Sequence, residues 1–254
     1  MGHRTMRALR ITLITAVVLG GLFVAADRIA VHVAEGEAAD RIKATQGLSA
    51  TPEVSIKGFP FLTQIANRQL DEVDVSVTGI DATAGGRTVA VSEVRAELAD
   101  VRIGGNFASA TAARAEGSAR VSYEDLTKSA PSGATVGYAG PERAAKGQVK
   151  VTGPSVQLLE GAGVAIPDAI KGVLGNEEIE VYSTIEAGES GTVRLKADSL
   201  PEIPVPGFDT ELRRAVDYDL RIDGLPGGIT LNRAKADETG LTFLGTGQGV
   251  SLVG

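Results

Sequence analysis

The sequence contains no cysteine and no tryptophan, and its two histidines are His3 and His32. The absence of cysteine excludes disulfides, thiolate catalysis, cysteine-ligated zinc and attachment of a lipid to a thiol. Because both histidines lie near the N-terminus, neither a histidine-based triad nor a multi-histidine metal centre is expected in the body of the chain. We therefore expect no catalytic residue, no metal site and no cofactor.

Basic side chains are outnumbered as well. There are 25 Lys and Arg against 32 Asp and Glu, which gives a net charge of −7 and a pI of about 5.0. Such a chain repels a phosphate backbone on average, so no nucleic-acid partner is expected. Its 254 residues, 43% of them apolar, are enough to build one large or two small domains.

The N-terminal segment carries a membrane-targeting pattern. Met1–Arg10 contains three arginines and no acid, and Ile11–Ala26 is an uncharged, mostly apolar run of sixteen residues. At 1.5 Å per residue this run spans about 24 Å, against roughly 30 Å of bilayer hydrocarbon. Residues 1–26 are therefore predicted to be a signal peptide or a membrane anchor, and both remain open. The positive flank places the rest of the chain outside the cytoplasm, in the cell membrane or envelope.

Residues 27–47 are predicted to form a helical stalk, because apolar residues recur there at steps of three and four until Gly47. Beyond Pro52 the period changes to two, as in Val73, Val75 and Val77. One-sided alternation of this kind is typical of antiparallel sheet. The phase of the alternation slips after Val91 and again after Leu98, which predicts bulges that bend a long strand. We expect one elongated α+β domain over residues 48–254, with a long curved antiparallel sheet.

Short helices are predicted at Phe61–Leu70, at Tyr123–Ser129 behind a Ser122 cap, and at Pro167–Leu174. The stretch 130–147, rich in Gly, Pro and Ala, is predicted to be a loop. Gly245–Gly249 has the glycine spacing of a phosphate loop, but apolar strand residues follow it instead of a helix. We interpret it as a hairpin turn.

The most distinctive motif is Gly58–Gln64, in which Phe59 and Phe61 flank Pro60. Proline limits the local backbone, so both rings are presented with little conformational freedom to lose. The motif is either a strand-to-helix corner whose rings fill the core, or a wedge for an acyl chain or a bilayer surface. Residue physics alone favours the corner.

Together with Leu70–Val75 this motif resembles the signature of the LmeA-like family of actinobacterial cell-envelope proteins. The glycine-rich ending, from Gly224–Ile229 to Gly249–Leu252, is similar to the ending of that family. The resemblance implies an exported, membrane-associated protein that binds phospholipids and supports the biogenesis of mannose-containing envelope glycolipids of the lipomannan type. It also implies a fold similar to tubular lipid-binding domains, in which the sheet wraps a helix around an apolar groove.

The expected partners are thus a phospholipid and a membrane surface, and the expected site is a set of apolar side chains along the sheet and at the corner motif. Small aliphatic side chains leave room for an acyl chain better than they fill it. The candidate lipid-binding residues are Phe59, Pro60, Phe61, Leu62, Ile65, Val73, Val75, Val77, Leu220, Ile222 and Phe243, and the candidate headgroup contacts are Arg213 and Arg214.

Two other functions are compatible with the same residues. An envelope scaffold or interaction domain would use the sheet as a packed core with no lipid cavity. A glycolipid hydrolase would use carboxylates such as Asp71 and Asp217, although carboxylates on the solvent face of a strand are ordinarily just hydrated.

Overall fold

The structure is a computed structural model of the chain. It describes residues 2–84, 87–105, 109–130, 132–161, 163, 165–175, 177–188, 192–199, 218–221 and 228–253.

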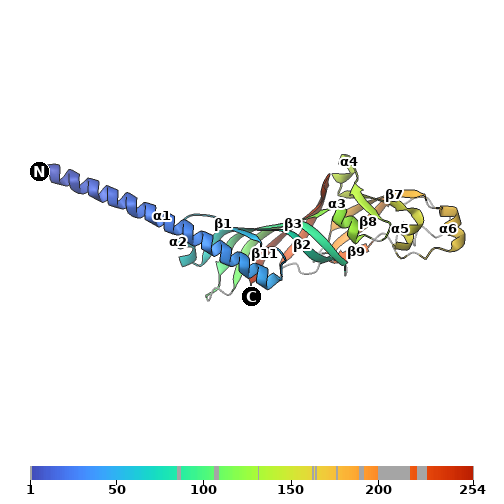
Figure 1. Ribbon diagram of the computed structural model, residues 1–254, viewed down its shortest axis with the longest axis horizontal. Helices are drawn as coiled ribbons and strands as arrows, with labels where there is room; N and C mark the ends of the chain where they lie inside the picture. The colour runs from blue at the N-terminus through green and yellow to red at the C-terminus, as the bar shows by residue number, and fades with distance from the viewer. Residues whose placement is uncertain are drawn as a thin grey trace.

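A single helix, α1 (Gly2–Gln46), forms the N-terminal part of the chain. Figure 1 shows its first half projecting away from the body and its second half lying along the sheet. The stretch Leu9–Gln46 contains a window long and apolar enough to cross a membrane, and none of that window is buried against the protein. No proline interrupts the helix, so it continues past Ala26 into the predicted stalk.

A six-stranded antiparallel sheet forms the centre of the body, in the order β1-β2-β3-β4-β11-β10. This confirms the predicted α+β fold with a long antiparallel sheet after an N-terminal apolar helix. The strands are β1 (Glu53–Ile56), β2 (Gln69–Ala84), β3 (Arg87–Ile103), β4 (Ala110–Ser122), β10 (Ile229–Asp237) and β11 (Gly240–Val253).

The bulges predicted in β3 are wrong in form, because the register of β3 with β2 and with β4 does not shift along the described pairs. Two irregularities occur at these places instead. The first is at Ser92, which lies opposite Gly79, a residue with a φ of 64°. The second is at Asp100, whose own φ is 53°. In a regular strand, two residues an odd number of positions apart face opposite sides of the sheet. Leu98 and Val101, three residues apart on either side of Asp100, are nevertheless both buried. The irregularities therefore turn apolar side chains back to one face of the sheet.

A second antiparallel sheet has the order β5-β6-β7-β8-β9. The sequence patterns do not separate it from the first sheet. The loop predicted at 130–147 is wrong for two segments, because β5 and the short helix α4 lie in it. Only four residues of β5 pair with β6, so the alternation there is too short to detect. The strands are β5 (Thr135–Tyr138), β6 (Gln148–Pro154), β7 (Glu178–Ala187), β8 (Thr192–Ser199) and β9 (Tyr218–Arg221).

The short helices largely follow their sequence signals. α3 (Tyr123–Ser129) begins at Ser122, whose side-chain oxygen accepts a hydrogen bond from the backbone N–H of Asp125 at 3.1 Å. α6 (Asp168–Leu174) ends at a glycine, as predicted. α2 (Phe61–Ala66) is shorter than predicted, because Arg68 takes a φ of 54° and turns the chain into β2. The remaining helices are α4 (Pro141–Ala144) and α5 (Ser155–Gly161).

The hairpin turn predicted at Gly245–Gly249 is wrong: this segment lies inside β11. Its glycines allow close strand contact. A Cβ added at Gly247 would lie 2.6 Å from the carbonyl oxygen of Gly228. The turn that joins β10 to β11 is instead at Asp237–Gly240.

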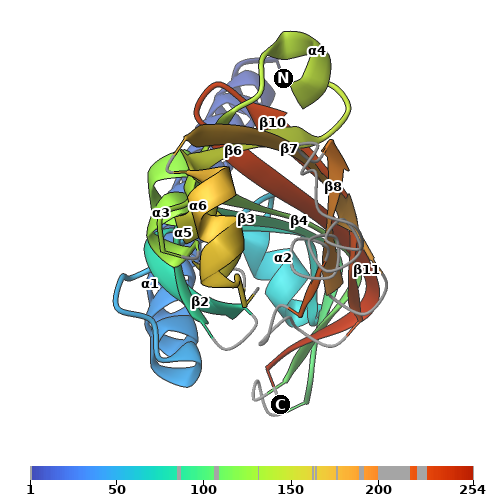
Figure 2. The same cartoon turned by 90° about the vertical axis from the view of Figure 1, so that its right-hand side faces the viewer.

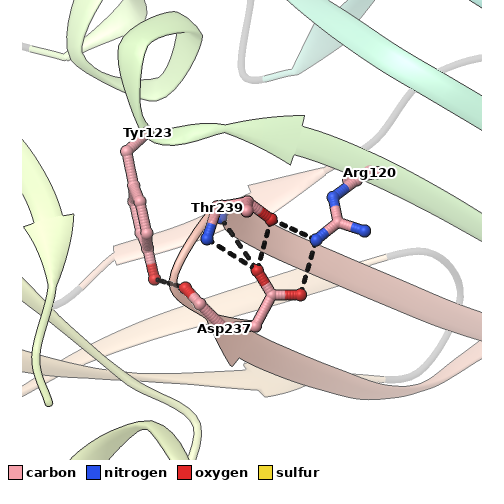
Figure 3. Close-up of polar contacts among 5 residues, drawn as sticks. Arg120, Tyr123, Asp237 and Thr239 are labelled. Atoms are coloured by element: carbon pink, nitrogen blue, oxygen red, sulfur yellow. Dashed lines mark hydrogen bonds and ion pairs between the residues drawn. The ribbon is translucent and has the colours of Figure 1, made fainter.

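Polar contacts close this turn (Figure 3). The Asp237 carboxylate accepts hydrogen bonds from the backbone N–H groups of Thr239 at 2.8 Å and Gly240 at 3.2 Å, and it pairs with Arg120 at 2.5 Å. Hydrogen bonds from Thr239 and Arg120 hold the pKa of Asp237 below its usual range. Tyr123 donates to the backbone carbonyl of Asp237 at 2.8 Å, and burial together with the nearby carboxylate raises the pKa of Tyr123 to about 12. The turn is thereby tied to the start of α3.

Two apolar clusters lie on the same face of the six-stranded sheet, which we call the inner face. At one end α1 and α2 pack on it through Val31, Ala39 and Phe61. At the other end the second sheet packs on Leu231 and Leu241. Figure 2, viewed from the end that carries α5 and α6, shows α2 within the arch formed by β2, β3, β4 and β11.

The close contact at Gly247 can be tested by substitution. Gly247→Ala should destabilise the fold by about 1–3 kcal/mol, because the added methyl group meets a backbone oxygen that cannot move freely. Gly137→Ala, in β5, is the control, since nothing lies within 4 Å of its added Cβ. Denaturant unfolding measures both. Equal stability of the two variants would support a turn at Gly245–Gly249 and contradict the strand.

Candidate functional site

The Gly58–Gln64 segment forms the corner between β1 and α2. Gly58 has a φ of 90°, and a Cβ there would lie 2.5 Å from the Gln64 side-chain nitrogen. Gln64, itself buried, donates to the Lys57 carbonyl at 3.1 Å and accepts from the backbone N–H of Asp71 at 2.8 Å. The corner therefore requires a glycine and is fastened internally by one amide side chain.

The two phenylalanine rings of the corner have different surroundings. Phe61 is 4% exposed and belongs to the core cluster beneath α1. Phe59 is 57% exposed and Leu62 is 37% exposed. Pro60 is half-buried, and Ile65 packs on the core cluster. Each reading of the motif thus fits one ring: Phe61 fills the core and Phe59 is presented to the outside.

A stripe of α1 residues at four-residue steps fastens the helix to the body; we call it the docking stripe. Asp27, which is fully buried, accepts a hydrogen bond from the backbone N–H of Leu62 at 2.9 Å. Glu35 accepts one from the backbone N–H of Ile56 at 2.8 Å. The other members of the stripe are Val31 and Ala39, both in the core cluster, and Lys43, which donates to Thr51 at 2.9 Å. Docking begins at Asp27, the first residue after the apolar run.

Three candidate residues of the sheet lie in two adjacent cross-strand rows of the inner face. We call these the central rows, because they join the two apolar clusters: Val75 and Ala96 pack against the cluster under α1 and α2, and Leu231, Phe243 and Ala234 belong to or pack against the cluster of the second sheet. Val73, another candidate, lies one row nearer the helices, within their core cluster. The first central row is Val75, Ala96, Gly117, Gly245 and Leu231; the second is Val77, Val94, Ala119, Phe243 and Ala234.

Small residues occupy the middle of the central rows. Gly117 and Gly245 face each other across β4 and β11, and Ala119 follows on the same face. The only atom within 4 Å of a Cβ added at Gly117 is a backbone oxygen, at 3.7 Å. A Cβ at this position would therefore contact no neighbouring side chain.

Phe243 connects the central rows to the second sheet. Its ring packs partly against the cluster that contains Val149, Ile185 and Val193. Leu220 belongs to β9 at the edge of the second sheet, where its backbone pairs with Val193. The candidates Ile222, Arg213 and Arg214 lie outside the described residues, as does Asp217.

Carboxylates do not gather in the described part of the chain: no group of three or more His, Asp or Glu there is arranged to hold a metal ion. Asp71 is exposed at the start of β2. Asp74 pairs with Lys57 at 3.1 Å across β1 and β2.

Sequence patterns alone did not indicate the docking stripe or the role of Gly117. The sequence pattern identifies Asp27 only as the end of the apolar run, and the available signal is that Asp27 and Glu35 lie eight residues apart, on the same face of a helix. Gly117 interrupts the alternation of β4 with no turn residue beside it, which is the pattern of a glycine placed within a strand for space.

Comparison with known proteins gives one match. The sequence profile described as LmeA-like phospholipid-binding matches residues 25–246, which include the docked half of α1 and most of both sheets. No curated protein and no solved structure matches the chain.

The Asp27 contact generates a prediction for stability. Asp27→Ala removes the acceptor of the partly buried hydrogen bond from the Leu62 N–H at the start of α2, which should cost about 1–3 kcal/mol. Asp40→Ala, at an exposed position of the same helix, is the control. Urea unfolding of the full chain in detergent micelles compares them. Identical midpoints would mean that the docking stripe does not depend on Asp27.

Proposed function

We propose a function from the premise that the chain belongs to the LmeA-like phospholipid-binding family. The protein binds a phospholipid at an extracytoplasmic membrane surface and supports the biogenesis of mannose-containing envelope glycolipids. The acyl chains of the bound phospholipid lie along the inner face of the six-stranded sheet.

The observation that carries this proposal is the extent of the family match. It covers residues 25–246 and so includes the corner motif, the central rows and the second sheet, while most of the apolar run precedes it. The description of the family therefore applies to the body of the protein.

Apolar side chains of the central rows supply the affinity in this proposal. Each methylene group transferred from water to an apolar surface contributes about 0.8 kcal/mol, so a half-buried acyl chain gains several kcal/mol without a polar contact. Val75, Val77 and Phe243 border this surface, and no side chain lies within 4 Å of a Cβ added at Gly117, between them. In this proposal Arg213 and Arg214 contact the lipid phosphate.

Membrane association follows from α1 in the same proposal. Its apolar run is unburied and long enough to reach across most of a bilayer. The arginines before the run stay in the cytoplasm, which leaves the sheets on the opposite side. No reaction is assigned to the protein.

The proposal is tested by measuring the phospholipid that copurifies with the protein. The full-length chain, expressed in a bacterial envelope and purified in mild detergent, should retain phospholipid at a fixed ratio in native mass spectrometry. A chain that arrives without lipid and takes none from mixed micelles would support the scaffold alternative. Hydrolysis of an added envelope glycolipid, lost in Asp71→Asn, would support the hydrolase.

Gly117→Val should reduce phospholipid occupancy by about tenfold, because displacing two methylene groups at about 0.8 kcal/mol each amounts to roughly that factor. Folding should be preserved, since valine suits a strand. Ser118→Val, on the opposite face of the same strand, is the matched control and should retain lipid. Equal occupancy in the two variants would exclude the central rows as the binding surface. Lipid titration followed by native mass spectrometry provides the measurement.

A further inference from the structure

Large apolar side chains remain exposed at one place beyond the apolar run. In the described part of the chain after Ala26, those more than a third exposed are Ile29 at 67%, Val33 at 65%, Phe59 at 57% and Leu62 at 37%. We call these four the anchor collar. They come from two segments far apart in sequence, α1 and the corner motif, yet they gather within two turns of the end of the apolar run.

Contacts between the two segments hold the collar together. The backbone N–H of Leu62 donates to Asp27, and the guanidinium of Arg28 lies 5.4 Å from the centre of the Phe59 ring. Ile29 and Val33 lie one turn apart on the face of α1 that points away from the docking stripe. Figure 1 shows α2 beside the point where α1 leaves the sheet. Exposed apolar groups therefore lie on two sides of this level, on the outer face of α1 and on the corner, while Arg28 and the exposed His32 lie on another side of the helix.

This arrangement favours lipid over a protein as the occupant. A protein partner would cover one face, whereas the collar has apolar groups on the outer side of α1 and at the corner. The collar is also continuous with the exposed apolar run, which no part of the body covers. Lipid is the one environment that contacts all sides of a membrane helix at the same depth.

Helix length agrees with this placement. The run Ile11–Ala26 spans about 24 Å, which is shorter than the roughly 30 Å of bilayer hydrocarbon. Counting on to Val33 extends the apolar length to about 34 Å and makes up the difference. The collar then lies at the boundary between acyl chains and headgroups.

Charges at this level are arranged for such a boundary. The Asp27 carboxylate is shielded from solvent and paired with Arg28 at 2.6 Å. The guanidinium of Arg28 lies over the Phe59 ring and is half exposed, so at the membrane boundary it would be within reach of lipid phosphates. His32, which is exposed, lies within reach of the headgroup layer.

We propose that the anchor collar is embedded in the leaflet from which α1 emerges, so that the α2 end of the six-stranded sheet rests directly on lipid. This rests on the membrane association proposed above. It identifies Phe59 and Leu62 as membrane-contact residues. It also places one end of the inner face next to the bilayer, which is the source of the phospholipid.

The absence of tryptophan makes the depth of each position measurable. Single-tryptophan variants Phe59→Trp and Leu62→Trp of the full-length chain are reconstituted in vesicles of phosphatidylcholine and phosphatidylglycerol. A fraction of the lipid carries bromine near the ester end of the acyl chains. Interfacial side chains lie about 5–10 Å into the headgroup and acyl boundary, so both variants should be quenched at least about twofold.

Three further variants serve as controls for the quenching measurement. Val18→Trp, in the middle of the apolar run, is measured with lipid that carries bromine near the methyl end of its chains and reports on the run, and Tyr182→Trp reports on the second sheet, far from α1. Repeating Phe59→Trp with Gly117→Val obstructs the inner face, so quenching that persists there comes from the bilayer and not from a bound lipid. The expected result is strong quenching at positions 18, 59 and 62 and little at position 182.

Other outcomes overturn the proposal in distinguishable ways. Quenching at position 18 without quenching at 59 and 62 would leave the membrane association standing and remove the collar from the bilayer. No quenching at position 18 would contradict the membrane association as well. Loss of the Phe59→Trp signal in the Gly117→Val chain would assign the contact to a bound lipid. Leu62→Trp decides the question if Phe59→Trp does not fold.

Discussion

The docking stripe is the interaction on which the rest of the arrangement depends. A helix that carries an unburied apolar run gains little from a soluble body unless its second half is fixed to that body. Asp27 and Glu35 achieve this with hydrogen bonds from backbone N–H groups that the corner and β1 would otherwise leave unpaired, and Val31 and Ala39 bury apolar surface between them. The position of the corner, the exposure of Phe59 and the covered end of the inner face all follow from where this stripe begins.

The central rows of the inner face are small in the middle and larger at the sides. Such a row would be a poor core for two layers packed directly on each other, since close packing requires side chains to interdigitate. In the function proposed above, the acyl chains of a phospholipid form the third layer on this surface. The irregularities at Gly79 and Asp100 serve the same surface, because they return apolar side chains to one face along strands that are longer than one covering layer.

Much of the fold was accessible from residue patterns, and the reason differs from element to element. The alternation in Val73–Val77 and the phase slips in β3 follow from the two-residue period of a half-buried strand, and Ser122 with Asp125 is a local cap signal. The division into two sheets was not accessible, because it depends on pairing between strands far apart in sequence. The turn predicted at Gly245–Gly249 is wrong for a related reason. From sequence alone, a glycine needed for the close approach of a neighbouring strand cannot be distinguished from a glycine that forms a turn. The corner motif allowed two readings, and only the three-dimensional contacts assign Phe61 to one and Phe59 to the other.

The unbroken course of α1 has a mechanical consequence. A helix that continues without proline from the apolar run into the docked half transmits any change in its inclination to the sheets. In the membrane-seated arrangement proposed above, bilayer thickness sets that inclination, since a helix tilts to match the hydrocarbon it crosses. In a thicker membrane the body would stand closer to the bilayer normal, and in a thinner one it would tilt toward the membrane plane. Lipid composition would therefore change the direction in which the body points away from the membrane.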